Sequence, residues 1–266
     1  MSPLPILLLL LQPPGQWECK AYLYGDGVFT FDIAQSQPLE HFTNGLYVPH
    51  PSLASKVKRP DDGPARAEVH PVGRFAEFDV QDVFYLDRNR TRAKVVLVGR
   101  NGQYRPLLWL FHDGALNLSA SEIVTVNEVE ILMSRTREDG TGHFWLEDYF
   151  VFDPPLQKLV NLRVQERIQE ELGRLLPAGH GVWKGGGFDI RTLTFSHSIW
   201  KEGNANCCPT GGSVTLNFRL SAGRLELAAS SVEPAADSVS PPKPHPDHPG
   251  FTSTHLPPTT VGINRR

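Results

Sequence analysis

Apolar and polar residues alternate along most of the chain from residue 74 onward, the pattern of half-buried β-strands. Residues 94–98 instead form a continuous, β-branched run, which predicts a strand that is buried on both faces. Asn101 and Gly102 mark a hairpin turn before a returning strand at 107–111. Further strand patterns cover residues 123–126, 129–132, 143–152, 188–200, 213–220 and 224–227. The sequence therefore predicts a mainly β (α+β) fold built from antiparallel meander sheets.

The first hydrophobic segments predict a β-hairpin. Gly25, Asp26 and Gly27 separate an aromatic run at 22–24 from a second run at 28–33. The following stretch, residues 35–72, is polar and interrupted by prolines, and we interpret it as a long irregular loop.

One segment has helical periodicity. A single face at 3.6-residue spacing carries Val164, Ile168, Leu172, Leu175 and Leu176, and the opposite face is charged. Pro177 and Gly179 end the pattern. We predict one amphipathic helix that packs on a face of a sheet.

The two ends of the chain differ from the rest. Leu4 to Leu11 is an apolar run that is too short to span a bilayer but fits the core of a signal peptide, although no Lys or Arg precedes it. We therefore predict a signal segment at 1–16, with a frayed apolar N-terminus or a buried first strand as the alternatives. Residues 17–230 are expected to form one domain. The Pro-, Ser- and His-rich tail, 231–266, has almost no large apolar residues and is predicted to be disordered.

Composition narrows the classes of partner. The 26 basic and 29 acidic residues give a net charge of -3, which offers no electrostatic reason to expect nucleic acid. The sequence predicts no transmembrane span. The chain has only three cysteines and they lack CxxC spacing, which argues against a zinc site. We expect no metal, no cofactor and no catalytic group. The Ser196, His197 and Ser198 run lacks a nucleophile elbow and is interpreted as part of a strand with a polar face.

Cys19, Cys207 and Cys208 are the candidate structural site. In an exported protein three cysteines permit one disulfide. Three pairings are open: Cys19 with Cys207, Cys19 with Cys208, and the adjacent pair. Loop-closure entropy favours a Cys19 bridge, because it would close almost the whole domain. We expect a structural disulfide and no reactive thiol.

The loop that holds Cys207 and Cys208 carries a recognisable pattern, Asn204 to Gly212, which reads Asn-Ala-Asn-Cys-Cys-Pro-Thr-Gly-Gly. It resembles a loop of exported bacterial proteins of unknown function, and lipoproteins of the LppP/LprE type have a similar Cys-Cys-Pro segment. The resemblance extends over roughly residues 75–228, including the upstream segment 182–189. It implies an exported location and a β-rich fold, and it supplies no known reaction.

These features predict a secreted or periplasmic bacterial protein, or one held at the membrane by an uncleaved N-terminal segment. The leading hypothesis is a non-enzymatic binding or structural module with an extracellular protein or glycan ligand. The alternative is an extracellular hydrolase or protease-inhibitor-like factor. An enzyme should have a deep pocket with convergent polar groups, whereas a binding module should have a shallow aromatic or apolar patch.

Overall fold

A computed structural model describes residues 17–23, 27–57, 66–87, 90–112, 116–138, 145–155, 157–182, 187–205, 208–221 and 223–235. Strands dominate these residues, which confirms the predicted mainly β class. The predicted signal segment, 1–16, lies outside the described residues. None of the described helices is both long and apolar enough to cross a membrane.

The first sheet has seven strands in the order β2-β1-β7-β6-β5-β4, with β3 beside β7. The strands are β1 (Trp17–Leu23), β2 (Gly27–Ile33), β3 (Gln37–Pro38), β4 (Arg66–Phe75), β5 (Phe78–Asp87), β6 (Arg90–Arg100) and β7 (Gln103–Phe111). β1 and β2 form the predicted antiparallel hairpin. β4 to β7 form an antiparallel meander that starts at the far edge and returns beside β1, so β7 and β1 pair in parallel.

The segment 35–72, predicted to be an irregular loop, is more ordered than the sequence suggested. It contains β3, two short helices, α1 (Leu39–Thr43) and α2 (Pro51–Ala54), and the first residues of β4. The Tyr85 hydroxyl donates to the carbonyl of Phe42 at 2.6 Å, and the Trp109 indole donates to that of Tyr47 at 2.8 Å. β4 lacked a clear strand signal because it is an edge strand with mostly exposed side chains.

The middle sheet packs against the first sheet on one face and against the C-terminal unit on the other. It has the order β12-β11-β10-β8, with β9 beside β10. Its strands are β8 (Leu116–Leu118), β9 (Glu122–Val126), β10 (Val129–Glu138), β11 (Trp145–Asp153) and β12 (Lys158–Asn161). Leu132 and Phe150 contact the core shared with the first sheet, whereas Ile131 and Tyr149 contact the core on the opposite side. This strict alternation makes the middle sheet the shared wall of two cores.

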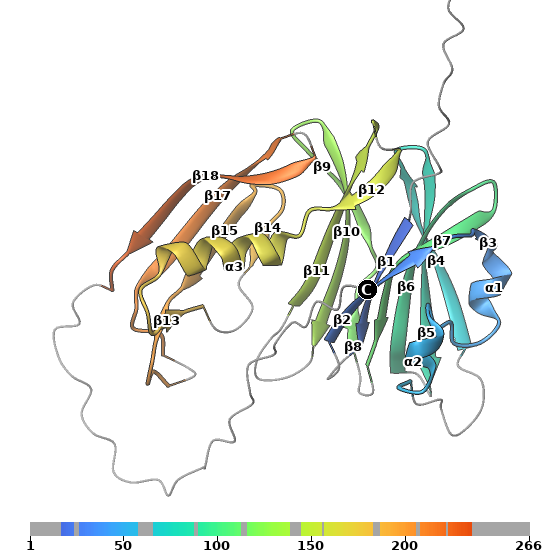
Figure 1. Ribbon diagram of the computed structural model, residues 1–266, viewed down its shortest axis with the longest axis horizontal. Helices are drawn as coiled ribbons and strands as arrows, with labels where there is room; N and C mark the ends of the chain where they lie inside the picture. The colour runs from blue at the N-terminus through green and yellow to red at the C-terminus, as the bar shows by residue number, and fades with distance from the viewer. Residues whose placement is uncertain are drawn as a thin grey trace, which may run out of the picture.

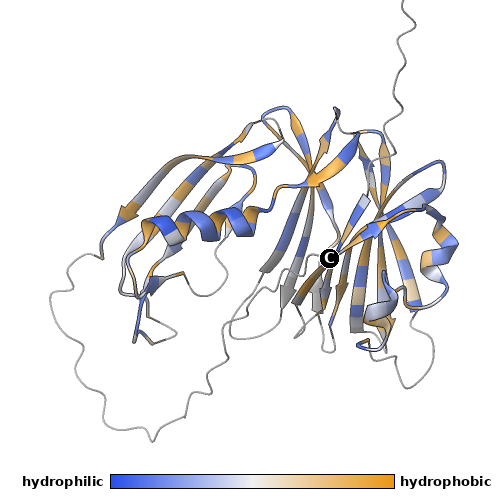
Figure 2. Cartoon of the chain, viewed as in Figure 1, coloured by the Kyte–Doolittle hydropathy of each residue, from blue (hydrophilic) through white to orange (hydrophobic). Residues whose placement is uncertain are grey.

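The C-terminal unit contains the predicted amphipathic helix, α3 (Val164–Leu175), and a sheet in the order β14-β15-β17-β18. The strands are β14 (Phe188–Asp189), β15 (Thr194–Ser198), β17 (Ser213–Ser221) and β18 (Arg224–Glu233), and a two-stranded ribbon joins β13 (His180–Gly181) to β16 (Trp200–Lys201). Val164, Ile168 and Leu172 of α3 are buried in the same core as both sheets. Figure 1 shows α3 beside this sheet. Figure 2 shows hydrophilic residues along the side of α3 that faces the viewer.

Two strand predictions near the end of the chain need correction. The expected strand 188–200 is divided into β14, β15 and β16, and a turn with Leu193 at a φ of 54° separates the first two. β18 continues to Glu233, beyond the predicted end at 227 and into the predicted disordered tail. Small residues and Ser on an edge strand give little apolar alternation, and the sequence pattern therefore missed this extension. Residues 236–266 of the tail lie outside the described residues.

Candidate functional site

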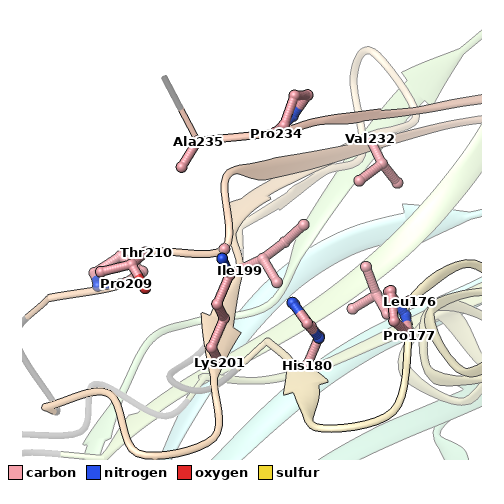
Figure 3. A pocket seen from close by; sticks show the side chains of 11 residues that line it. Leu176, Pro177, His180, Ile199, Lys201, Pro209, Thr210, Val232, Pro234 and Ala235 are labelled. Carbon is pink, nitrogen blue, oxygen red and sulfur yellow. The ribbon is translucent and has the colours of Figure 1, made fainter. Parts of the chain in front are cut away.

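An open pocket of about 800 Å³ lies at the end of the C-terminal unit (Figure 3). The residues after α3, the β13–β16 ribbon, the loop before β17 and the end of β18 meet there. The lining residues are Leu176, Pro177, His180, Ile199, Lys201, Pro209, Thr210, Gly211, Val232, Pro234 and Ala235. Most of these side chains are apolar, and part of the loop that carries the Cys-Cys-Pro pattern forms one wall.

The pocket lies just beyond the C-terminal end of α3. The helix ends at Leu175, and the proline at 177 cannot continue it because proline has no backbone N–H for the helical hydrogen bond. Val214 on β17 is fully buried, but its pairing partner Val232 on β18 is 43% exposed. Ile199 is buried at the floor. The uncovered end of a hydrophobic core thus becomes the bottom of the pocket.

The loop from Asn204 to Gly212 is organised by one side chain. The Asn204 Oδ1 atom accepts hydrogen bonds from the backbone N–H of Lys201 at 2.9 Å and from the N–H and hydroxyl of Thr210 at 3.0 and 3.1 Å. Asn side chains stabilise loops in this way because they replace backbone acceptors. The Asn of the motif therefore has a structural role, which is to close the loop that forms the pocket wall.

The two glycines of the motif permit close packing. A Cβ atom at Gly211 would lie 2.6 Å from the Ile199 Cγ2 atom and 2.7 Å from its carbonyl oxygen. Gly212 has a φ of 95°, and a Cβ there would clash with the carbonyl oxygen of Glu233. The Gly211 N–H donates to the Ile199 carbonyl at 2.7 Å, and the Ile199 N–H donates to that of Gly212 at 2.9 Å. The loop is therefore held tightly against the floor of the pocket.

Two ionisable side chains line the pocket, and both can carry positive charge. His180 and Lys201 are cross-strand partners in the ribbon, and their side chains extend toward Ile199 (Figure 3). The His180 Nδ1 atom lies 3.2 Å from the Ala178 carbonyl oxygen. Within the described part of the chain, Lys201 makes no ion pair. The nearest acidic side chain in sequence, Glu202, packs beside Gly179.

The predicted Cys19 bridge is wrong. Cys19 is a free thiol that is fully buried in the core between the first sheet and α1 and α2. Burial raises the pKa of this thiol because a thiolate would lose its hydration. Cys208 is disulfide-bonded, and Cys207 lies outside the described residues. Loop-closure entropy favoured Cys19 because the sequence could not show that Cys19 and Cys208 belong to different units.

The Ser196 and His197 pattern does not form a nucleophile and base. The Ser196 hydroxyl lies 3.2 Å from the Thr215 hydroxyl across the strand pair. The His197 Nδ1 atom contacts the Ser198 carbonyl oxygen at 3.0 Å, and its ring packs on that of Trp200. These contacts suit a polar strand face, as the sequence analysis suggested. Among the described residues, no cluster of three His, Cys, Asp or Glu side chains is placed to hold a metal.

A buried ion pair, which the sequence analysis missed, lies between the first and middle sheets. Lys94 Nζ and Asp82 Oδ2 are 3.2 Å apart, and both side chains are fully buried. Lys94 also donates to the Ser119 carbonyl at 2.8 Å and to the Ser121 and Ser134 hydroxyls at 3.0 and 3.2 Å. Burial lowers the pKa of Lys94, and the charge of Asp82 opposes that shift. Each charge has hydrogen-bond partners on or beside the facing sheet, so we assign the pair a structural role.

No family model, curated protein or solved structure matches this chain. Function is therefore inferred from the pocket and from the chemistry of the residues that line it.

Proposed function

We propose that this protein is an exported bacterial binding module that holds a small apolar ligand in the open pocket of its C-terminal unit. The observation that carries the proposal is the uncovered core at the end of α3, where Val232 is exposed above a buried Ile199. Ligand sites are typically concave and mostly apolar, with volumes of roughly 300–1,000 Å³ and a few polar groups. This pocket fits that description in volume, and seven of its lining residues have apolar side chains.

The proposal is tested with a neutral fluorescent dye, Nile red, whose emission rises in an apolar site. The wild-type chain should bind it with one saturable site. Val232→Glu should weaken this binding at least tenfold, because it places a charge in the apolar wall. Val28→Glu is the matched control, since Val28 is 53% exposed on β2, in a different sheet. Equal dye binding by both variants and the wild type would contradict the proposal.

Export is the second part of the proposal, and the N-terminal apolar run and the Cys-Cys-Pro motif support it. The native gene should yield a protein in the periplasm, the envelope or the medium, with residues 1–16 removed if the segment is cleaved. Cell fractionation with N-terminal sequencing measures both. Recovery of the intact N-terminus in the cytoplasmic fraction would contradict export without affecting the proposal for the pocket.

A further inference from the structure

The backbone around the pocket has few hydrogen-bond donors left for a ligand. The N–H groups of Lys201 and Thr210 are bonded to Asn204, and those of Ile199 and Gly211 are bonded within the loop contact. The N–H of His180 donates to the Pro177 carbonyl at 3.1 Å. A ligand that must be held by backbone groups, such as an added peptide strand, therefore finds most of the donors occupied.

The prolines of the remaining walls also supply no donors. Pro177, Pro209 and Pro234 line the pocket, and proline has no backbone N–H to donate. The Thr210 hydroxyl already donates to Asn204. Glycans carry many hydroxyl groups, and each hydroxyl that is buried without a partner costs free energy. The shortage of free donors thus disfavours glycans and extended peptides, and the apolar side chains of Leu176, Ile199 and Val232 suit a ligand whose body is hydrocarbon.

The side chains of His180 and Lys201 are the ionisable groups among the described residues that line the pocket. Both extend from the ribbon toward the floor of the pocket (Figure 3). Among the residues that the structure describes, no acidic side chain lines the pocket, and Lys201 makes no ion pair. Glu202 and Glu233, the acidic residues that follow Lys201 and Val232, are exposed and do not belong to the lining. The charged end of a complementary ligand must therefore be negative.

We propose that the ligand of this pocket is an anionic single-chain amphiphile, an alkyl carboxylate, with its hydrocarbon chain over Ile199 and Val232 and its carboxylate at Lys201. This inference rests on the proposed binding function and specifies the chemical class of its ligand. Burial of the chain supplies affinity, which grows with each CH₂ group that is removed from water. The ammonium of Lys201 then selects the headgroup.

The test compares three probes with the same twelve-carbon chain: dodecanoate, dodecanol and dodecylammonium. Each displaces Nile red from the full-length protein below its micelle concentration. Dodecanoate should bind about fivefold more tightly than dodecanol, the ratio expected for one partly exposed ion pair. Dodecylammonium should bind more weakly than both, because its charge is repelled by Lys201.

Variants at one position show whether the preference comes from the proposed ion pair. Lys201→Ala should reduce the dodecanoate-to-dodecanol affinity ratio to about one, and Lys201→Arg should preserve it because the positive charge remains. Lys56→Ala is the matched control, since Lys56 is exposed beside α2 on the first sheet. It should leave the ratio at its wild-type value.

The outcomes separate the ligand class from the binding function. If all three probes bind equally, or if Lys201→Ala keeps the preference for dodecanoate, the anionic class is wrong while the apolar pocket still binds. If only dodecylammonium displaces the dye, the anionic class is likewise wrong. If neither Nile red nor any probe binds, the proposed binding function is wrong, and this inference fails with it.

Discussion

Lys94→Met removes one partner of the buried ion pair and is the most direct test of how the first and middle sheets are held together. The substitution keeps a side chain of similar length but deletes the ammonium. Asp82 would then retain only its bonds from the Ser121 N–H at 2.5 Å and hydroxyl at 2.9 Å. The hydroxyl of Ser134 and the carbonyl of Ser119 would lose their donor.

The expected cost follows from the complete burial of both side chains. Breaking a buried pair by removing one partner typically costs about 3–5 kcal/mol, because the other charge stays buried without compensation. For a domain of this size each kcal/mol lowers the melting temperature by about 2–4 °C. The melting temperature of Lys94→Met should therefore fall by about 6–20 °C in a calorimetric or circular-dichroism melt.

A double substitution identifies the source of this cost. Asp82→Asn with Lys94→Met leaves no unpaired charge, and Asn can still accept from the Ser121 N–H. The double variant should recover a substantial part of the free energy of unfolding that Lys94→Met loses. A double-mutant cycle measures this recovery as the coupling free energy between the two side chains. Arg191→Met is the surface control, since Arg191 is exposed in the turn between β14 and β15, and it should change stability by less than about 0.5 kcal/mol. If Lys94→Met melts within 2 °C of the wild type, the burial argument is refuted.

Three further results are expected. Gly212→Ala should lower the free energy of unfolding in chemical denaturation by more than Gly45→Ala. Gly45 also has a positive φ, but nothing lies near a Cβ added there. Equal losses for the two variants would contradict the close packing of the loop. A chain that ends at Ser231 should have a lower melting temperature and bind less Nile red than one that ends at Ala235. The shorter chain loses the last residue pairs between β17 and β18 and part of the pocket wall. Identical behaviour of the two chains would count against that wall. Cys19 should resist alkylation in the native protein and react after unfolding, and rapid native labelling measured by mass spectrometry would contradict its burial.

The fold class was predictable because its main signals are local. The run 94–98 is β6, buried on both faces as its continuous apolar pattern predicted, and the turn at Gly102 joins it to β7. The face of α3 that carries Ile168 and Leu172 is the buried one, as its periodicity indicated. These patterns indicate which side of a strand or helix is buried. They do not depend on the element against which that side packs.

The candidate site was only partly predictable because it depends on contacts between distant segments. The Cys-Cys-Pro motif drew attention to the correct loop, but not to the pocket that it forms with the end of α3 and with Val232. Lys94 stands at the start of an apolar strand and does not interrupt its apolar run. A single lysine at such a position gives no sign in the sequence that its side chain is buried. The failed Cys19 pairing has the same origin, because chain entropy depends on separation along the sequence and not on which sheet each residue joins.

The central claim is that the pocket of the C-terminal unit is the ligand-binding site. It is tested most directly by titrating ¹⁵N-labelled protein with dodecanoate and following the amide resonances by NMR. Saturable shifts should be concentrated at the amides of the residues that surround the proposed ligand, which are His180, Ile199, Thr210, Gly211 and Val232. Shifts confined to the first sheet, or no saturable shift at any concentration below micelle formation, would contradict this claim.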